Sequence, residues 1–184
     1  GFLDTSVGLF ASRKPFVYVR GNHETRGAYA RNFFRYLAGP EGKFYYAFTY
    51  GPIRFIVLDS GEDKPDTDVE YSGLVDFDNY ILEQKEWLAR ELESPEFRAA
   101  SFRVVLSHIP FGKGSWYGSE RLRKQLLPLL ESVRIDLMLS GHNHAFGFMD
   151  KGKVTAFPII VNSNNSVLTM FGSEDLLKVQ VKQI

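Results

Sequence analysis

The chain has 184 residues, of which 44% are hydrophobic and 24% are charged, a composition that indicates one globular domain rather than a disordered segment. Its 22 basic and 22 acidic residues cancel, so no overall charge draws it to nucleic acid or to an anionic membrane. Cysteine is absent, which excludes disulfides and thiolate metal sites and leaves His, Asp, Asn and Glu as metal ligands. No apolar run approaches the roughly 20 residues of a membrane span, and the localisation stays unknown.

The first part of the chain predicts a helix, a strand and a polar turn. Apolar residues recur at helical spacing over residues 2–12, which predicts an amphipathic helix. The run Phe-Val-Tyr-Val at 16–19 predicts a short buried strand that stops at Gly21. The Asn-His-Glu run at 22–24 would then lie at the carboxyl end of this strand.

A second helix, a hairpin and a long loop are predicted next. Aromatic and apolar residues at helical spacing predict a helix over 26–37. The strand-like runs 44–50 and 53–58 flank a Gly-Pro turn at 51–52 and predict a β-hairpin. Acidic residues crowd residues 59–80 without the regular spacing of an EF-hand, so a solvated surface loop is favoured there over a Ca²⁺ site.

Helical spacing returns over residues 84–92, and Ser94-Pro95 ends that helix. The apolar run 102–107 predicts a strand, and His108 follows it at once. The glycine-rich loop over residues 112–118 is placed to form one wall of a pocket. It carries Lys113, Trp116 and Tyr117.

The last third of the chain predicts a further helix and three strands. The helix covers residues 122–133 and is kinked or restarted at Pro128. A strand over 136–139 leads into Gly-His-Asn-His at 141–144. Two more strands are expected near residues 155–161 and 176–181.

All 4 histidines of the chain lie just beyond a predicted strand, in a Gly-containing or Pro-flanked turn. Ligands of open α/β sheets bind in the crevice beyond the carboxyl ends of the strands, so three such strands would bring their polar residues together there. Neutral imidazole is a good ligand for Zn, Mn and Fe, and the side-chain oxygen of Asn22 suits the same ions. The pattern therefore predicts a metal site.

Three motifs carry a family resemblance. They are Gly21-Asn22-His23-Glu24, Ser107-His108 with Pro110, and Gly141-His142-Asn143-His144. In order and approximate spacing they resemble the last three motifs of the calcineurin-like metallophosphoesterase superfamily, and they look closest to its purple acid phosphatase-like branch. The resemblance implies an α/β fold of stacked sheets flanked by helices (αββα), a binuclear metal centre and hydrolysis of small phosphate esters.

The resemblance also assigns roles to individual residues. Asn22, His108 and His142 would bind one metal ion, and His144 would bind the other. His23 would lie beside the leaving-group oxygen, and Asn22 would also contact the phosphate. In this class of enzyme two divalent or trivalent ions, with Mn, Fe or Zn expected here, activate a bridging water and offset charge during displacement.

The superfamily's first two motifs, which contain Asp, are absent from this sequence. Asp4 is the sole carboxylate before Asn22 and lacks their Gly-Asp context, so it is not assigned as a ligand. We therefore expect residues 1–184 to be the carboxyl-terminal portion of one metallophosphoesterase catalytic domain that lacks its N-terminal strands. Such a portion would bind metal partially, show little activity and expose a sheet edge through which it self-associates.

Other interpretations stay open at this point. A protein of this fold that serves as a non-catalytic scaffold is the main alternative, and a nuclease is a third, disfavoured by the zero net charge. For Glu24 a structural bond to nearby backbone is at least as plausible as catalysis. Three aromatic residues beside the motifs are candidates for the substrate pocket, although mutual packing explains them equally well; they are Trp116, Tyr117 and Phe146. Lys113 and Arg121 are expected to be ordinary surface charges rather than phosphate ligands.

Overall fold

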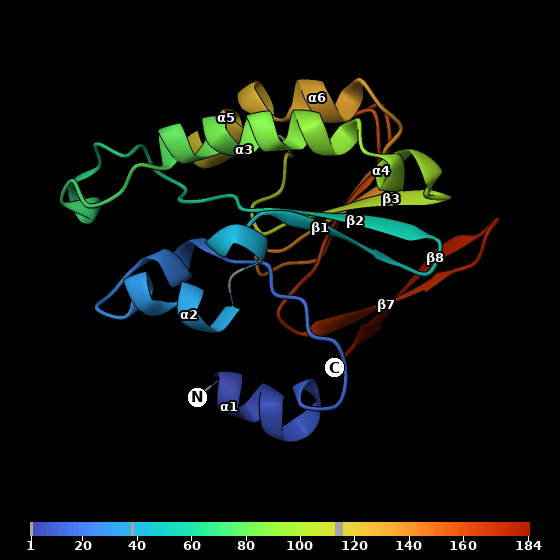
Figure 1. Ribbon diagram of the computed structural model, residues 1–184, viewed down its shortest axis with the longest axis horizontal. Helices are drawn as coiled ribbons and strands as arrows, with labels where there is room; N and C mark the ends of the chain where they lie inside the picture. The colour runs from blue at the N-terminus through green and yellow to red at the C-terminus, as the bar shows by residue number, and fades with distance from the viewer. Residues whose placement is uncertain (1, 38, 113–115) are drawn as a thin grey trace.

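A six-stranded sheet forms the centre of the computed structural model, which describes residues 2–37, 39–112 and 116–184 (Figure 1). Its spatial order is β1-β2-β3-β4-β6-β5. The strands are β1 (Tyr46–Tyr50), β2 (Ile53–Leu58), β3 (Phe102–Ser107), β4 (Leu137–Ser140), β5 (Gly147–Met149) and β6 (Ile159–Val161). β2, β3, β4 and β6 run parallel, and β1 and β5 are antiparallel edges. The carboxyl ends of the four parallel strands therefore share one edge of the sheet.

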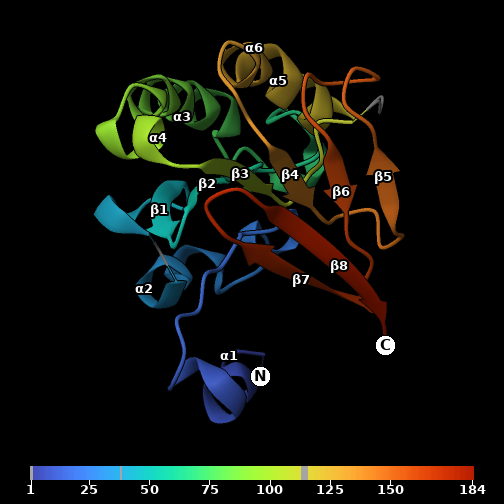
Figure 2. The ribbon, with the colours of Figure 1, turned by 90° about the vertical axis from the view of Figure 1, so that its right-hand side faces the viewer.

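Helices cover one face of this sheet, and a two-stranded sheet covers part of the other (Figure 2). The helices are α3 (Phe77–Leu92), α4 (Pro95–Ala99), α5 (Tyr117–Gln125) and α6 (Leu127–Glu131). β7 (Ser166–Gly172) and β8 (Leu177–Gln183) form the antiparallel pair on the opposite face. The order of layers is helices, sheet, sheet, which agrees with the predicted α/β class of stacked sheets flanked by helices.

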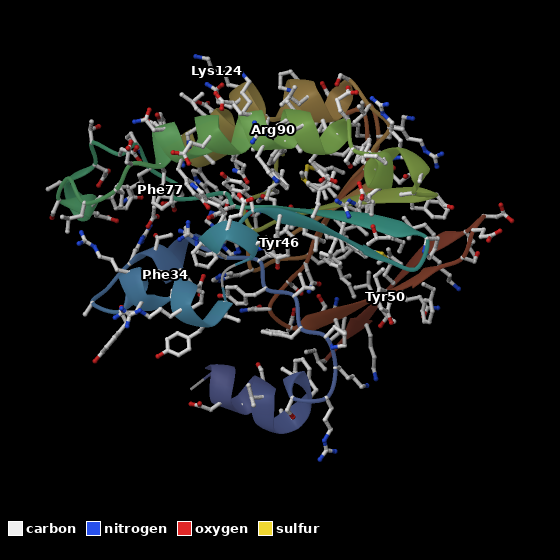
Figure 3. The ribbon with its side chains drawn as sticks, in the orientation of Figure 1. Phe34, Tyr46, Tyr50, Phe77, Arg90 and Lys124 are labelled. Atoms are coloured by element: carbon white, nitrogen blue, oxygen red, sulfur yellow. The ribbon has the colours of Figure 1, made fainter. Side chains whose placement is uncertain are left out.

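The central strands are apolar on both sides because both of their faces are covered. Val104 and Val105 are adjacent in β3 and fully buried, yet they belong to different apolar clusters. Val105 packs with Leu88 and other helix residues, whereas Val104 packs toward β7 and β8. Side chains fill the layer between α3 and the sheet (Figure 3).

The sequence pattern of α3 explains how it attaches to the sheet. Its buried residues recur every three or four positions and form one stripe, Phe77, Ile81, Gln84, Leu88 and Leu92. Beyond α3, the Ser94 side chain accepts a hydrogen bond from the Phe97 backbone N–H at 3.1 Å and caps α4, which Pro95 begins. The predicted helix end at Ser94-Pro95 is confirmed.

The hairpin, the strand before His108 and the helix restart near Pro128 are confirmed as well. β1 and β2 pair around Gly51, whose φ of 56° suits glycine in a tight turn. α5 ends at Gln125 and α6 begins at Leu127. Residues 2–11 are helical as predicted, as α1 (Phe2–Ser6) followed by a π-helical turn (Val7–Ala11).

Three local predictions are wrong. Residues 16–19 belong to neither of the sheets that the described residues form, and Val17 is exposed, because apolar character alone does not supply a neighbouring strand. The predicted helix 26–37 is broken into a 3₁₀ turn (Ala30–Asn32) and α2 (Phe34–Leu37). The predicted loop 112–118 is shorter, since α5 begins at Tyr117.

Two strands, β5 and β7, were not foreseen from the sequence. The acidic segment is also not a solvated loop throughout, because its first residues, from Asp59 to Glu62, are buried, and α3 already begins at Phe77. Asp59 pairs with Arg20, and both its backbone N–H and C=O bond the Gln84 amide at 2.8 and 2.9 Å. Arginine and amide partners thus offset the cost of burying these carboxylates. Within the described residues no helix is long and apolar enough to cross a membrane.

Candidate active site

His108 and His142 meet at the carboxyl ends of neighbouring parallel strands. Ser107, the last residue of β3, pairs in register with Ser140, the last residue of β4. The ladder continues one step further, because the Gly141 N–H donates to the His108 carbonyl oxygen at 3.0 Å. The two imidazoles therefore converge, with His108 Nε2 3.3 Å from His142 Nδ1 and the rings close to perpendicular at 81°.

The turn that carries Asn22 packs against His108. Residues Asn22–Thr25 form a 3₁₀ turn, and the Glu24 carboxylate accepts a hydrogen bond from the Gly21 backbone N–H at 2.9 Å. A Cβ atom on Gly21 would lie 3.2 Å from Cε1 of His108, so glycine permits this close approach. This hydrogen bond from nearby backbone agrees with a structural role for Glu24.

Asn22 is buried, with 1% of its surface exposed. Neither its side-chain oxygen nor its side-chain nitrogen has a hydrogen-bond partner among the described residues. An unpaired buried amide costs about 1–3 kcal/mol and calls for an explanation. A ligand at this position would supply one.

His142 and His144 both adopt left-handed backbone conformations, with φ of 68° and 56°. Such angles are uncommon for residues with a side chain and gather at functional turns. The Asn143 N–H donates to the Gly141 carbonyl oxygen at 2.8 Å and tightens this turn. His142 is half-buried beside His108, whereas His23 and His144 are exposed.

The environment keeps the central histidines neutral. Burial, followed by the neighbouring His142, lowers the pKa of His108 to about 4. Burial also lowers the pKa of His142, against the pull of Asp63, and the charges of His144 and His23 act in the same direction as burial. Because a metal ion binds neutral imidazole, both rings are ready to bind one at neutral pH.

The donor chemistry fits one metal ion. A buried amide without partners and two neutral imidazoles are suitable ligands for a transition metal. Over residues 2–37, 39–112 and 116–184, however, the structure holds no cluster of three or more His, Asp or Glu side chains positioned to bind a metal. The described residues thus supply fewer metal ligands than a complete two-metal centre needs.

The aromatic residues predicted for the substrate pocket have different surroundings. The Trp116 ring lies 4.8 Å from the His142 ring, edge to face, and so borders the site. The Tyr117 hydroxyl instead donates to the Asp78 carboxylate at 3.0 Å. Phe146 is exposed just before β5. A cavity of about 200 Å³ also borders His108, and it is lined by residues from the ends of β3 and β4.

The prediction that Arg121 is ordinary surface charge is wrong. Its guanidinium is buried, pairs with Asp78 and donates to the Glu62 carbonyl oxygen at 2.9 Å. Lys113 lies outside the described residues. Sequence patterns also missed Arg26 and Asp63, which lie near enough to His142 to act on its pKa. No motif spacing marks these two residues.

A sequence profile of known families decides the relationship. The calcineurin-like phosphoesterase profile matches residues 2–146, which include all three motifs. The chain belongs to the calcineurin-like phosphoesterase family. Purple acid phosphatase 23 of Arabidopsis thaliana is 25% identical over 158 residues, which cover 76% of this chain and 30% of that protein. Purple acid phosphatase 15 of the same plant is 27% identical over 153 residues, which cover 73% of this chain and 25% of that protein.

Among solved structures, purple acid phosphatase PPD1 from yellow lupin (Lupinus luteus) seeds aligns with a TM-score of 0.44 and 19% identity. The alignment covers 68% of this chain and 24% of that one. The chain thus spans about a third or less of the length of the relatives that it matches. The relatives support the purple acid phosphatase-like branch of the family.

Proposed function

We propose that this chain carries part of the active site of a metal-dependent phosphohydrolase that acts on small phosphate esters. The observation that carries the proposal is the buried Asn22 amide, unpaired among the described residues, on a turn that packs against His108, which in turn meets His142. Family membership supports phosphoester hydrolysis as the reaction class. A second part of the proposal is that residues 1–184 are the carboxyl-terminal portion of a longer catalytic domain; the match over 30% of one relative supports a portion of a longer protein.

In this proposal Asn22, His108 and His142 hold one metal ion, and His144 contributes to a second. Manganese, iron and zinc suit these ligands. When bound, the ions acidify a water molecule and neutralise charge on the phosphoryl oxygens.

The residues of the chain supply the remaining steps. His23 is exposed on the turn that starts at the buried Asn22, so its imidazole can reach the leaving-group oxygen of a bound ester and donate a proton to it. The Asn22 amide would hold the ion through its oxygen and could donate to a phosphoryl oxygen through its nitrogen. Glu24 holds the turn closed through the Gly21 N–H. Trp116 packs on His142 and limits the rotation of its ring.

Two measurements test the proposal. Calorimetric titration of the chain with Mn²⁺ or Zn²⁺ should show binding that His108→Ala and His142→Ala remove, while exchange of the exposed Lys153 for Ala leaves it unchanged. Hydrolysis of 4-nitrophenyl phosphate should be measured in the longest natural chain that contains these residues. We expect His23→Ala to lower kcat by about 10²-fold or more. Undiminished hydrolysis after His142→Ala and His144→Ala would overturn the proposed function.

A further inference from the structure

We infer that Glu62 is a positioning residue that holds the Asn22–Thr25 turn in place for the proposed metal site. Glu62 is fully buried, although it comes from the acidic segment that follows β2. A buried carboxylate persists only when partners satisfy it, and here the partners come mainly from the turn. The inference rests on the proposed function, because the turn matters through Asn22 and His23.

Both oxygens of the Glu62 carboxylate accept hydrogen bonds from residues at the end of the Asn22–Thr25 turn. Arg26 follows the turn directly, and its Nε and Nη2 atoms donate to the two oxygens at 2.9 and 2.7 Å, a paired geometry of high specificity. The Thr25 hydroxyl also donates to Glu62 and lies 2.7 Å from the Asn22 carbonyl oxygen, so its single proton is shared between the two acceptors. Glu62 therefore connects, through one side chain, to the backbone of Asn22 itself.

A third partner of Glu62 comes from another segment of the chain. The Tyr71 hydroxyl donates to a Glu62 oxygen at 3.0 Å, and Tyr71 belongs to a separate 3₁₀ turn, Val69–Tyr71. Burial raises the pKa of Glu62, but the hydrogen bonds from Arg26 and Thr25 outweigh it and hold the pKa below its usual value. The carboxylate is thus charged, and from a fixed position it forms an ion pair with Arg26 and accepts a hydrogen bond from Thr25.

The arrangement differs from that of a simple structural ion pair. The Arg26 N–H donates to the His23 carbonyl oxygen at 3.2 Å and closes the 3₁₀ turn, so the residue that Glu62 holds most strongly is also the one that ends the turn. Partners outside the ligand shell commonly change metal affinity by about 10- to 100-fold when they are removed. Loss of Glu62 should therefore loosen the turn and weaken metal binding.

Matched variants test the inference. Glu62→Gln keeps the shape and removes the charge, and Thr25→Val keeps the volume and removes the hydroxyl. Thr25→Ser restores the hydroxyl, and Tyr71→Phe removes one bond to the same carboxylate without touching the turn. The hydrogen-exchange rate of the Arg26 amide measures how often the turn opens. Calorimetric titration with Mn²⁺ or Zn²⁺ measures the affinity of the metal site.

We expect the exchange rate of the Arg26 amide and the Kd for metal to rise roughly tenfold in Glu62→Gln and Thr25→Val. Thr25→Ser and Tyr71→Phe should stay within about twofold of the wild type. Unchanged Arg26 exchange in Glu62→Gln, or an equal effect of Tyr71→Phe, would overturn the inference. If Glu62→Gln fails to fold, Thr25→Val and Thr25→Ser are compared instead. Equal Arg26 exchange rates and equal Kd values for metal in these two variants would overturn the inference. Faster Arg26 exchange in Glu62→Gln than in the wild type, together with a wild-type chain that binds no metal, would uphold the role of Glu62 in the turn and refute the proposed metal site separately.

Discussion

The Nε2 atom of His108 lies 3.3 Å from the Nδ1 atom of His142, although the two residues stand 34 positions apart. Their strands are parallel and in register, so the polar residue that follows each strand arrives at the same edge of the sheet. Two like groups at this distance cannot both take a proton without repulsion, and burial adds to that cost. The pair is therefore held neutral.

The first prediction concerns protonation of His108 in the metal-free protein. Its pKa should lie at about 4, because of burial first and His142 second. An unfolded chain would take up this proton near pH 6.5. Between these values the unfolded state binds more protons, so the free energy of unfolding should fall as the pH is lowered from 6.5 to 4. NMR titration of the His108 ring checks this; a midpoint near 6.5 in the folded chain contradicts it, and His142→Ala should raise the midpoint.

The second prediction separates stability from metal binding at Asn22. Replacing this buried residue with Ala removes an amide that is unpaired in the described structure, so no side-chain hydrogen bond is lost. Removal of the unpaired amide favours the folded state, whereas the small cavity that is left opposes it, so the free energy of unfolding in the presence of EDTA should change by less than about 1 kcal/mol. The rise in melting temperature on adding Mn²⁺ or Zn²⁺ should shrink sharply. A large loss of stability without metal would mean that Asn22 serves the fold instead.

The third prediction concerns the close approach at Gly21. Its φ of −90° and ψ of 169° suit any residue, so Gly21→Ala acts through space alone. The new methyl group would lie 2.6 Å from a Glu24 oxygen and 3.2 Å from the His108 ring. We expect about 1–2 kcal/mol lower stability from the lost hydrogen bond and weaker metal binding from displacement of the ring. Glu24→Ala is the control, because it loses the same bond without pressing on His108; equal metal affinities in the two variants would refute the steric account.

The fourth prediction concerns the attachment of α3 to the sheet. Leu88 is 0% exposed and packs in the main core, whereas Leu82 on the same helix is 44% exposed. Leu88→Ala should lower the free energy of unfolding by about 2–5 kcal/mol, and Leu82→Ala by less than about 1 kcal/mol. Urea denaturation followed by circular dichroism measures both. Similar losses of unfolding free energy in the two variants would contradict the assignment of Leu88 to the core between α3 and the sheet.

The sequence predicted best where a local pattern has a single physical solution. The hairpin around Gly51, the helix end at Ser94-Pro95 and the strands before His108 and His142 follow from turn chemistry and apolar runs that need no distant partner to be recognised. The acidic composition of residues 59–80 predicts a solvated loop, because composition does not reveal the partners of buried carboxylates. Asp59 and Glu62 are buried beside Arg20 and Arg26, which approach from another part of the chain.

By itself, the sequence determined the family, the three motifs and the α/β class, because these depend on residue types in order along the chain. Only the tertiary structure decided which of these residues meet. It brings His108 against His142 and sets the Asn22 turn beside His108, leaves His144 exposed, and turns Tyr117 toward Asp78. It also placed Glu62 behind the Asn22 turn. Register between strands and the burial of charge are long-range properties, so they follow from the packed chain as a whole and not from any short stretch of it.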